Sequence, residues 1–130
     1  METSARVFHW LPRIICILAI LFVSLFALDS FAPGLTIWQQ LSAFFIHLIP
    51  SFILLAFLVI AWKREFAGGI LFIITGITSS ILVYIMNYNR LHSVGKSLGI
   101  VAIIAVPFII AGILFLISYL LKKKIIRNNQ

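Results

Sequence analysis

The sequence predicts an all-α, polytopic membrane protein: one domain over residues 1–130, folded as an antiparallel bundle of four transmembrane helices. Of the 130 residues, 63% are hydrophobic and only 10% are charged, whereas a soluble domain has about one quarter charged residues. A soluble chain this short has too much surface to bury so many apolar side chains. The charged residues gather between four long apolar runs. Such runs match the roughly 20 residues that a helix needs to cross a bilayer.

The first predicted helix covers residues 11–28. Its uninterrupted apolar run, 14–28, is short, and Pro12 and Arg13 stand at its start. A basic start and an apolar middle are also typical of a signal peptide. However, the run is long for a signal peptide, and Pro33 directly follows the best cleavage site. We therefore expect a retained first helix.

The other three predicted helices cover residues 36–62, 66–86 and 98–121. Thr36 and Gln39 have the spacing of a capping box, which opens the second helix. The connections between all four helices are short, so consecutive helices are expected to be antiparallel neighbours.

The distribution of basic residues predicts the orientation. Eight Lys and Arg fall on one side of the four helices and two on the other. The eight are Arg6, Arg13, Lys63, Arg64, Lys122, Lys123, Lys124 and Arg127, and the two are Arg90 and Lys96. Cytoplasmic loops carry the excess of Lys and Arg. We therefore expect a multi-pass protein of the cell membrane with both termini cytoplasmic.

Composition also excludes several function classes. The net charge is +7, but the basic residues form no stripe with exposed aromatic residues, so no nucleic-acid binding is expected. Cys16 is the one cysteine, which leaves no CxxC pair and no disulfide. No carboxylate pair, metal-ligand spacing, phosphate loop or catalytic triad is present, and Glu65 is assigned to a short connection. The sequence therefore predicts no catalytic residue, no cofactor and no metal, and a protein that is not an enzyme.

His47 marks the candidate polar site within the membrane. It lies roughly 16 Å below the start of the second helix, at a rise of about 1.5 Å per residue, and ionisable residues at such depth are functional candidates. Gln40, Phe44 and Ser51 share its helical stripe. Pro50 removes a backbone hydrogen bond one turn away, which predicts a local kink.

Two interpretations of this stripe stay open. In the first, Gln40, His47 and Ser51, together with Thr75 of the third helix, form a proton relay or a small polar pathway. In the second, His47 stays neutral and hydrogen-bonds a Ser or Thr of the third helix. The second interpretation is favoured.

Asp29 is a candidate acid at the outer mouth of such a pathway. It ends the first predicted helix on the outer side. One interpretation makes it an acceptor for a substrate or a proton. The favoured one pairs it with Arg90 or Lys96, or leaves it in solvent.

Small residues predict where the helices pack closely. Gly69, Gly76 and Ser80 share one stripe of the third helix, and Gly112 lies in the fourth. Small residues spaced by four let helix backbones approach each other in membranes. We expect these four residues to form packing faces, with contacts between subunits as the alternative.

Four short stretches carry a resemblance to known proteins: FALD at 26–29, HLIPS at 47–51, AWK at 61–63 and GGI at 68–70. With them the chain resembles a family of small uncharacterised bacterial four-helix integral membrane proteins, a domain of unknown function. The resemblance covers about the first three helices. It implies a bacterial or archaeal membrane, such as the bacterial inner membrane, and no activity. The chain lacks the glutamate of small multidrug transporters and the CxxC of quinone-linked thiol oxidoreductases.

Three functions follow as hypotheses. The leading one is a non-enzymatic structural or accessory membrane subunit, or a homo-oligomer, whose partners are the lipid bilayer and a second copy or another membrane protein. The first alternative is a small transporter or channel with a polar pathway around His47. The second alternative is a membrane enzyme that needs a partner chain or a cofactor for the missing groups.

Overall fold

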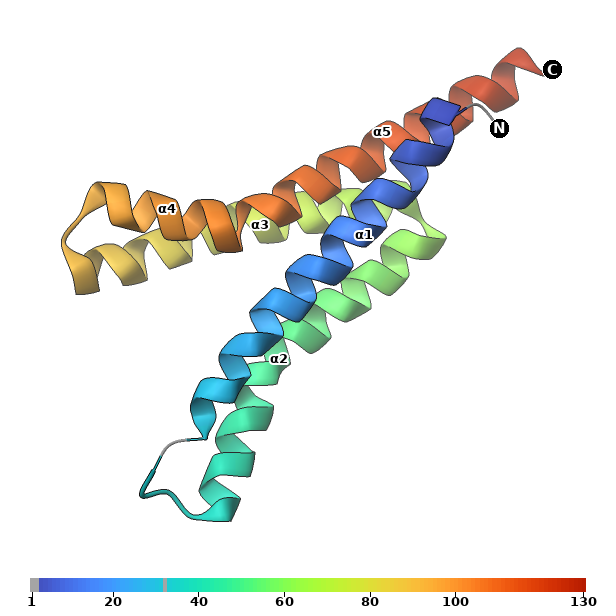
Figure 1. Ribbon diagram of the computed structural model, residues 1–130. Coiled ribbons are helices and arrows are strands. Elements are labelled where there is room, and N and C mark those ends of the chain that lie inside the picture. Colours follow the sequence, from blue (N-terminus) through green and yellow to red (C-terminus); the bar gives the residue numbers. More distant parts are fainter. Residues whose placement is uncertain (1–2, 32) are drawn as a thin grey trace.

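A computed structural model describes residues 3–31 and 33–130 (Figure 1). Within these residues the chain forms five α-helices and one 3₁₀ helix. They are α1 (Thr3–Leu25), η1 (Phe26–Ser30), α2 (Ile37–Lys63), α3 (Glu65–Leu91), α4 (Val94–Ile104) and α5 (Val106–Asn128). The prediction of an all-α chain with four long apolar helices is confirmed.

α1 begins eight residues before the predicted start at residue 11. The apolar run used for the prediction marks a membrane-sized stretch, whereas the more polar turns before it are helical as well. Pro12 lies inside α1, where it is buried. The last turns, predicted as α-helix up to residue 28, tighten into η1, in keeping with the frequent use of 3₁₀ turns at helix ends.

α2 begins at the predicted capping box. The Thr36 hydroxyl oxygen accepts from the Gln39 backbone N–H at 3.2 Å, and the Gln39 side-chain oxygen accepts from the Thr36 N–H at 3.0 Å. α2 continues through Pro50 to Lys63. Only Arg64 separates it from α3, and a Cβ atom on Gly68 would overlap the Ala61 side chain across this turn. The tight turn therefore needs glycine at that position.

The fourth predicted helix, 98–121, is wrong as a single helix. It begins at Val94 and breaks at Ala105 into α4 and α5. Pro107 explains the break, because it has no N–H to donate and its ring clashes with the carbonyl four residues earlier. α3 is also longer than predicted and ends at Leu91, where His92 adopts the left-handed conformation with φ of 51°.

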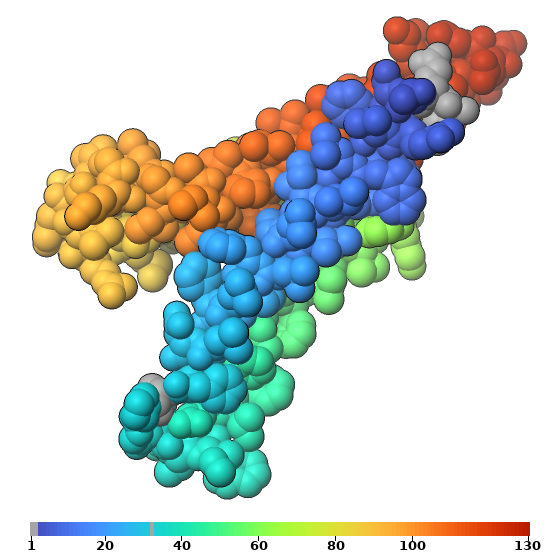
Figure 2. All heavy atoms as spheres, viewed as in Figure 1, coloured from blue at the N-terminus to red at the C-terminus, as the bar shows by residue number. Residues whose placement is uncertain are grey.

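The helices form two pairs that diverge from a shared end (Figure 1). α1 lies beside α2, and α3 lies beside α4 and α5. The start of α1 and the end of α5 lie at the shared end, while the other ends of the two pairs point apart, which the space-filling view also shows (Figure 2). The core lies near the shared end, where Phe72 stacks between Phe108 and Phe115 at ring distances of 6.1 and 6.0 Å.

This arrangement leaves an unusually large apolar surface. The accessible surface is 8662 Å², compared with about 6,900 Å² for a compact soluble protein of this mass. Of the most apolar stretch of α2 and of α3, only 17% is buried. Four spans are long and apolar enough to cross a membrane: Thr3–Ser30, Ile37–Lys63, Glu65–Leu91 and Val106–Asn128.

Candidate functional site

A buried charged cluster lies at the shared end of the helices. Its centre is Glu65, the first residue of α3, whose side chain is only 8% exposed. One of its carboxylate oxygens, Oε1, faces four polar groups. Lys122 Nζ lies 2.8 Å away, Arg13 Nη2 and Ser118 Oγ both lie 3.1 Å away, and His9 Nδ1 lies 3.2 Å away. These groups come from α1 and α5, so one carboxylate connects three helices. We name these five residues the Glu65 cluster.

Arg13 is the most buried charged member of the cluster, with 1% of its side chain exposed. Its guanidinium group donates to the backbone oxygens of His9 and Trp62 as well as to Glu65. The guanidinium carbon also lies 5.1 Å from the centre of the Trp62 ring and 5.3 Å from that of Phe115. Such aromatic faces attract cations. Arg13 is therefore held by rings and by acceptors together.

The geometry of the cluster defines its charge. An ammonium group only donates hydrogen bonds, so the close contact of Lys122 Nζ with His9 Nδ1 requires this nitrogen to accept. His9 is then neutral, with its proton on Nε2, and its Nδ1 donates no hydrogen bond to Glu65 although the two atoms lie 3.2 Å apart. Arg13 and Lys122 carry two positive charges against the one negative charge of Glu65. The Glu65 cluster thus keeps one net positive charge.

The sequence reasoning missed this cluster. Glu65 was assigned to a short connection, and Arg13 and Lys122 were used only in the count of basic residues that predicts the membrane orientation. Glu65 is instead the first residue of α3, because Arg64 alone joins α2 and α3, and its side chain is buried against α1 and α5. The available signal was Arg13, a charge next to an apolar run, which needs a nearby acid when it is buried. Which of the acids would meet it depends on the packing of helices far apart in sequence.

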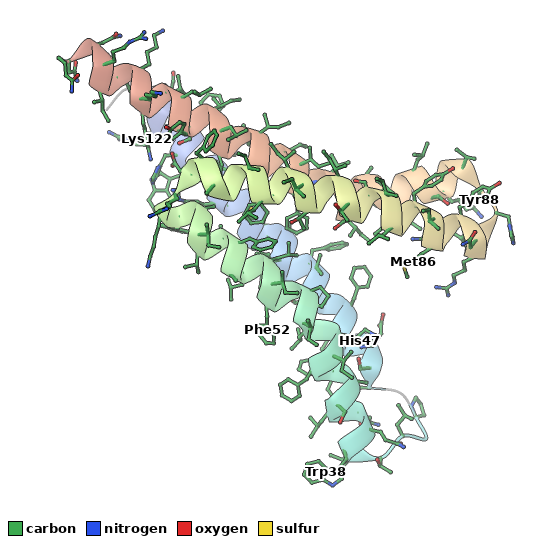
Figure 3. The ribbon with its side chains drawn as sticks, turned by 180° about the vertical axis from the view of Figure 1, so that it is seen from behind. Trp38, His47, Phe52, Met86, Tyr88 and Lys122 are labelled. Carbon is green, nitrogen blue, oxygen red and sulfur yellow. The ribbon has the colours of Figure 1, made fainter. Side chains whose placement is uncertain are left out.

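His47 lies on α2 in the arm away from the shared end, where its side chain is exposed (Figure 3). Its Nδ1 lies 2.7 Å from the Ala43 carbonyl oxygen and 3.2 Å from Ser30 Oγ. A carbonyl oxygen only accepts, so His47 donates from Nδ1. One interpretation of the sequence expected a hydroxyl partner from the third helix. The hydroxyl that contacts His47 belongs to Ser30 of η1 instead.

The other members of the predicted polar stripe divide between two places. Ser51 is buried and hydrogen-bonds Ser24 of α1 at 2.9 Å. The Gln40 side chain donates to the Leu35 carbonyl oxygen at 3.3 Å. Thr75 lies on α3, in the other helical pair. In residues 3–31 and 33–130 no hydrogen bond joins Thr75 to His47 or Ser51.

Asp29 is exposed at the end of η1. Arg90 and Lys96 lie at the end of the other helical pair. The described part of the chain contains no ion pair between Asp29 and either of these residues. The structure thus leaves Asp29 as an exposed acid.

Three predicted glycines lie where α3 meets α5. A Cβ atom on Gly69 would lie 2.9 Å from the Gly112 carbonyl oxygen, and one on Gly112 would lie 2.7 Å from that of Gly69. A Cβ atom on Gly76 would lie 3.0 Å from the Ile109 nitrogen. Ser80 donates to the Gly76 carbonyl oxygen at 2.7 Å. The two backbones therefore approach at positions where a side chain has no room.

Among the described residues, no group of three or more His, Cys, Asp or Glu side chains is arranged to hold a metal ion. No curated protein and no solved structure matches the chain. One family model matches residues 1–127, almost the whole chain. The match confirms the resemblance to an uncharacterised family: the chain belongs to the family described as Domain of unknown function (DUF7670).

Proposed function

We propose that this protein is a multi-pass membrane protein that acts by packing, as a structural or accessory subunit or as a homo-oligomer, and not as an enzyme. In this proposal four spans cross the cell membrane, alternately in opposite directions, and both termini are cytoplasmic. The fourth span combines α4 with the apolar part of α5.

The Glu65 cluster carries this proposal. Its polar groups are directed at one another, and Arg13 and Glu65 are almost fully buried. A site that serves a substrate leaves polar groups converging on an open pocket. Here Arg13 and Ser118 do not line the open groove beside the cluster, and together with Lys122 they donate to Glu65 and join α1 and α5 to α3. Such an arrangement suits a protein whose helices keep a fixed relative position, as a structural subunit requires.

Surface and charge support the membrane assignment. Apolar side chains are exposed along all four spans. A lipid bilayer removes the free-energy cost of exposing these side chains to water. The start of α1, the end of α5 and the turn between α2 and α3 lie at the shared end (Figure 1), which brings most of the basic residues to one side. Cytoplasmic ends carry such an excess.

A purification experiment tests the packing function. The full chain is extracted in a mild detergent, and the mass of the complex and its co-purifying proteins are determined. A stable homo-oligomer, or a stoichiometric membrane partner, is expected. A monomer without a partner that drives ion or solute flux in liposomes would contradict the proposal.

Cysteine labelling tests the orientation. In a Cys16→Ala background, single cysteines replace His92 and Lys123, which lie at opposite ends of the α3–α5 pair. A membrane-impermeant maleimide added outside is expected to label position 92 and not position 123. Labelling of both from outside would contradict the orientation.

A small transporter or channel is the second candidate function. The contacts Ser24–Ser51 and Ser30–His47 lie along the interface of η1 and α1 with α2. Beside them is an apolar hollow of about 570 Å³ to which Ser24 contributes. A liposome flux assay with His47→Ala, and with the exposed His92→Ala as control, tests it. Flux that is equal in both variants and in the unchanged protein would exclude His47 from the pathway.

A further inference from the structure

An open groove lies next to the Glu65 cluster, at the surface of the protein. It has a volume of about 530 Å³ and surrounds the turn between α2 and α3. Lys63, Arg64 and Lys122 contribute cations to its lining, and Trp62 and Tyr119 contribute aromatic rings. Glu65 is the one acid among the lining residues of this groove.

The groove is strongly positive in spite of Glu65. The carboxylate is already matched by Lys122 at 2.8 Å and by Arg13 at 3.1 Å, so these three residues keep one positive charge. Lys63 and Arg64 are exposed and form no ion pair among the described residues. Four cations and one carboxylate thus leave three positive charges around the groove. An anion entering it meets no uncompensated negative charge.

The walls of the groove have the chemistry of a membrane interface. Trp62 is 44% exposed and its ring is held by Trp10, at a ring distance of 6.1 Å, and by the Arg13 guanidinium group. Trp and Tyr side chains place their rings at the level of the lipid headgroups. Phe66 packs against Tyr119 at 5.4 Å and is 52% exposed. The groove therefore offers both cationic groups and apolar rings to a bound molecule.

From this juxtaposition we propose that the groove at Trp62, Lys63, Arg64 and Lys122 binds the phosphate headgroup of an anionic phospholipid, with its acyl chains along the exposed apolar surface of α3 beginning at Phe66. Basic pockets at the cytoplasmic ends of transmembrane helices suit such headgroups. The inference rests on the proposed membrane location. A free phosphate ion shares the headgroup chemistry but makes no use of the aromatic walls or the apolar surface.

Lipid retention by the full chain in mild detergent tests the proposal. Phosphatidylglycerol and phosphatidylcholine are added in equal amounts, and bound lipid is measured by native mass spectrometry. One phosphatidylglycerol per chain is expected. The variant K63Q/R64Q is expected to bind it roughly 30-fold more weakly, since each basic residue near a headgroup contributes about a factor of five.

The control K123Q/K124Q removes the same charge from the neighbouring basic stretch of α5, which lines a different groove. It is expected to keep the bound lipid. Equal weakening in both variants would show general electrostatic attraction and overturn the site, as would retention of phosphatidylcholine in place of phosphatidylglycerol. Inorganic phosphate is titrated in a parallel sample. If phosphate alone raises the melting temperature as much as phosphatidylglycerol does, the lipid assignment fails.

A second measurement leaves the basic residues intact, so it does not depend on how K63Q/R64Q folds. Trp10→Phe with Trp38→Phe leaves Trp62 as the single tryptophan, and Trp10→Phe with Trp62→Phe leaves Trp38. Brominated phosphatidylglycerol is expected to quench Trp62 more than brominated phosphatidylcholine does, and to quench Trp38 equally with both. Equal quenching of Trp62 overturns the site. Failure of the chain to resist carbonate extraction from membranes would instead refute the proposed membrane function.

Discussion

Lys122 Nζ lies 2.8 Å from Glu65 Oε1, although 57 positions separate the two residues in the chain. The contact joins the first turn of α3 to the basic end of α5. Arg13 of α1 reaches the same oxygen. One carboxylate therefore holds the shared end of both helical pairs.

Glu65→Gln is expected to destabilise the protein by about 3–5 kcal/mol, because it leaves the Arg13 charge buried without a counter-charge. The unfolding free energy in detergent, measured by chemical denaturation, checks this value. Asp29→Asn removes an equal charge at an exposed site and serves as the control. Equal stability of Glu65→Gln and the unchanged protein would show that the cluster does not fasten the helices.

A double-mutant cycle on Arg13 and Glu65 is expected to show strong coupling. E65L alone leaves the buried Arg13 charge unmatched, and R13M alone leaves Glu65 with Lys122 as its remaining cation, whereas the double variant R13M/E65L removes the whole buried pair. Replacement of a whole buried ion pair by apolar residues is often neutral or stabilising. The double variant is therefore expected to be more stable than E65L in the same denaturation assay. Losses that simply add would mean that the two side chains contribute independently.

Gly112→Ala is expected to separate α3 from α5. The added Cβ atom would lie 2.7 Å from the Gly69 carbonyl oxygen, which belongs to the backbone and cannot rotate away. Overpacking of this kind costs about 1–3 kcal/mol, measurable as a lower melting temperature in detergent. Gly99→Ala in α4, where nothing lies within 4 Å of the added atom, is the matched control and is expected to be neutral or slightly stabilising. A drop in both variants would locate the effect outside the α3–α5 contact.

Pro107→Ala is expected to join α4 and α5 into one continuous helix. It restores an N–H group and removes the ring that clashes with the preceding turn. Amide hydrogen exchange around residues 103–107 is expected to slow relative to the unchanged protein. Pro50→Ala is the control, because α2 is already continuous at Pro50. Unchanged exchange around Ala105 would assign the break to tertiary packing in place of proline.

Local features of the sequence were enough for the helices themselves. Long apolar runs predict membrane-sized helices, and the spacing of Thr36 and Gln39 predicts the start of α2, because a capping box involves only four consecutive residues. The break at Ala105 escaped prediction although Pro107 was visible. A proline in a helix can be tolerated, as Pro12 and Pro50 are here, or can end the helix, and the sequence alone does not distinguish the two outcomes.

The sequence by itself determined the all-α class, the four apolar spans and the clustering of basic charge, because hydrophobic runs and caps depend on neighbouring residues. Only the tertiary structure decided that the helices diverge as two pairs and that Glu65 is buried. The four side chains that surround its carboxylate lie more than 50 positions away from it: His9, Arg13, Ser118 and Lys122. Their meeting depends on how α1 and α5 pack against α3, with Gly69 and Gly112 setting the approach of α3 and α5.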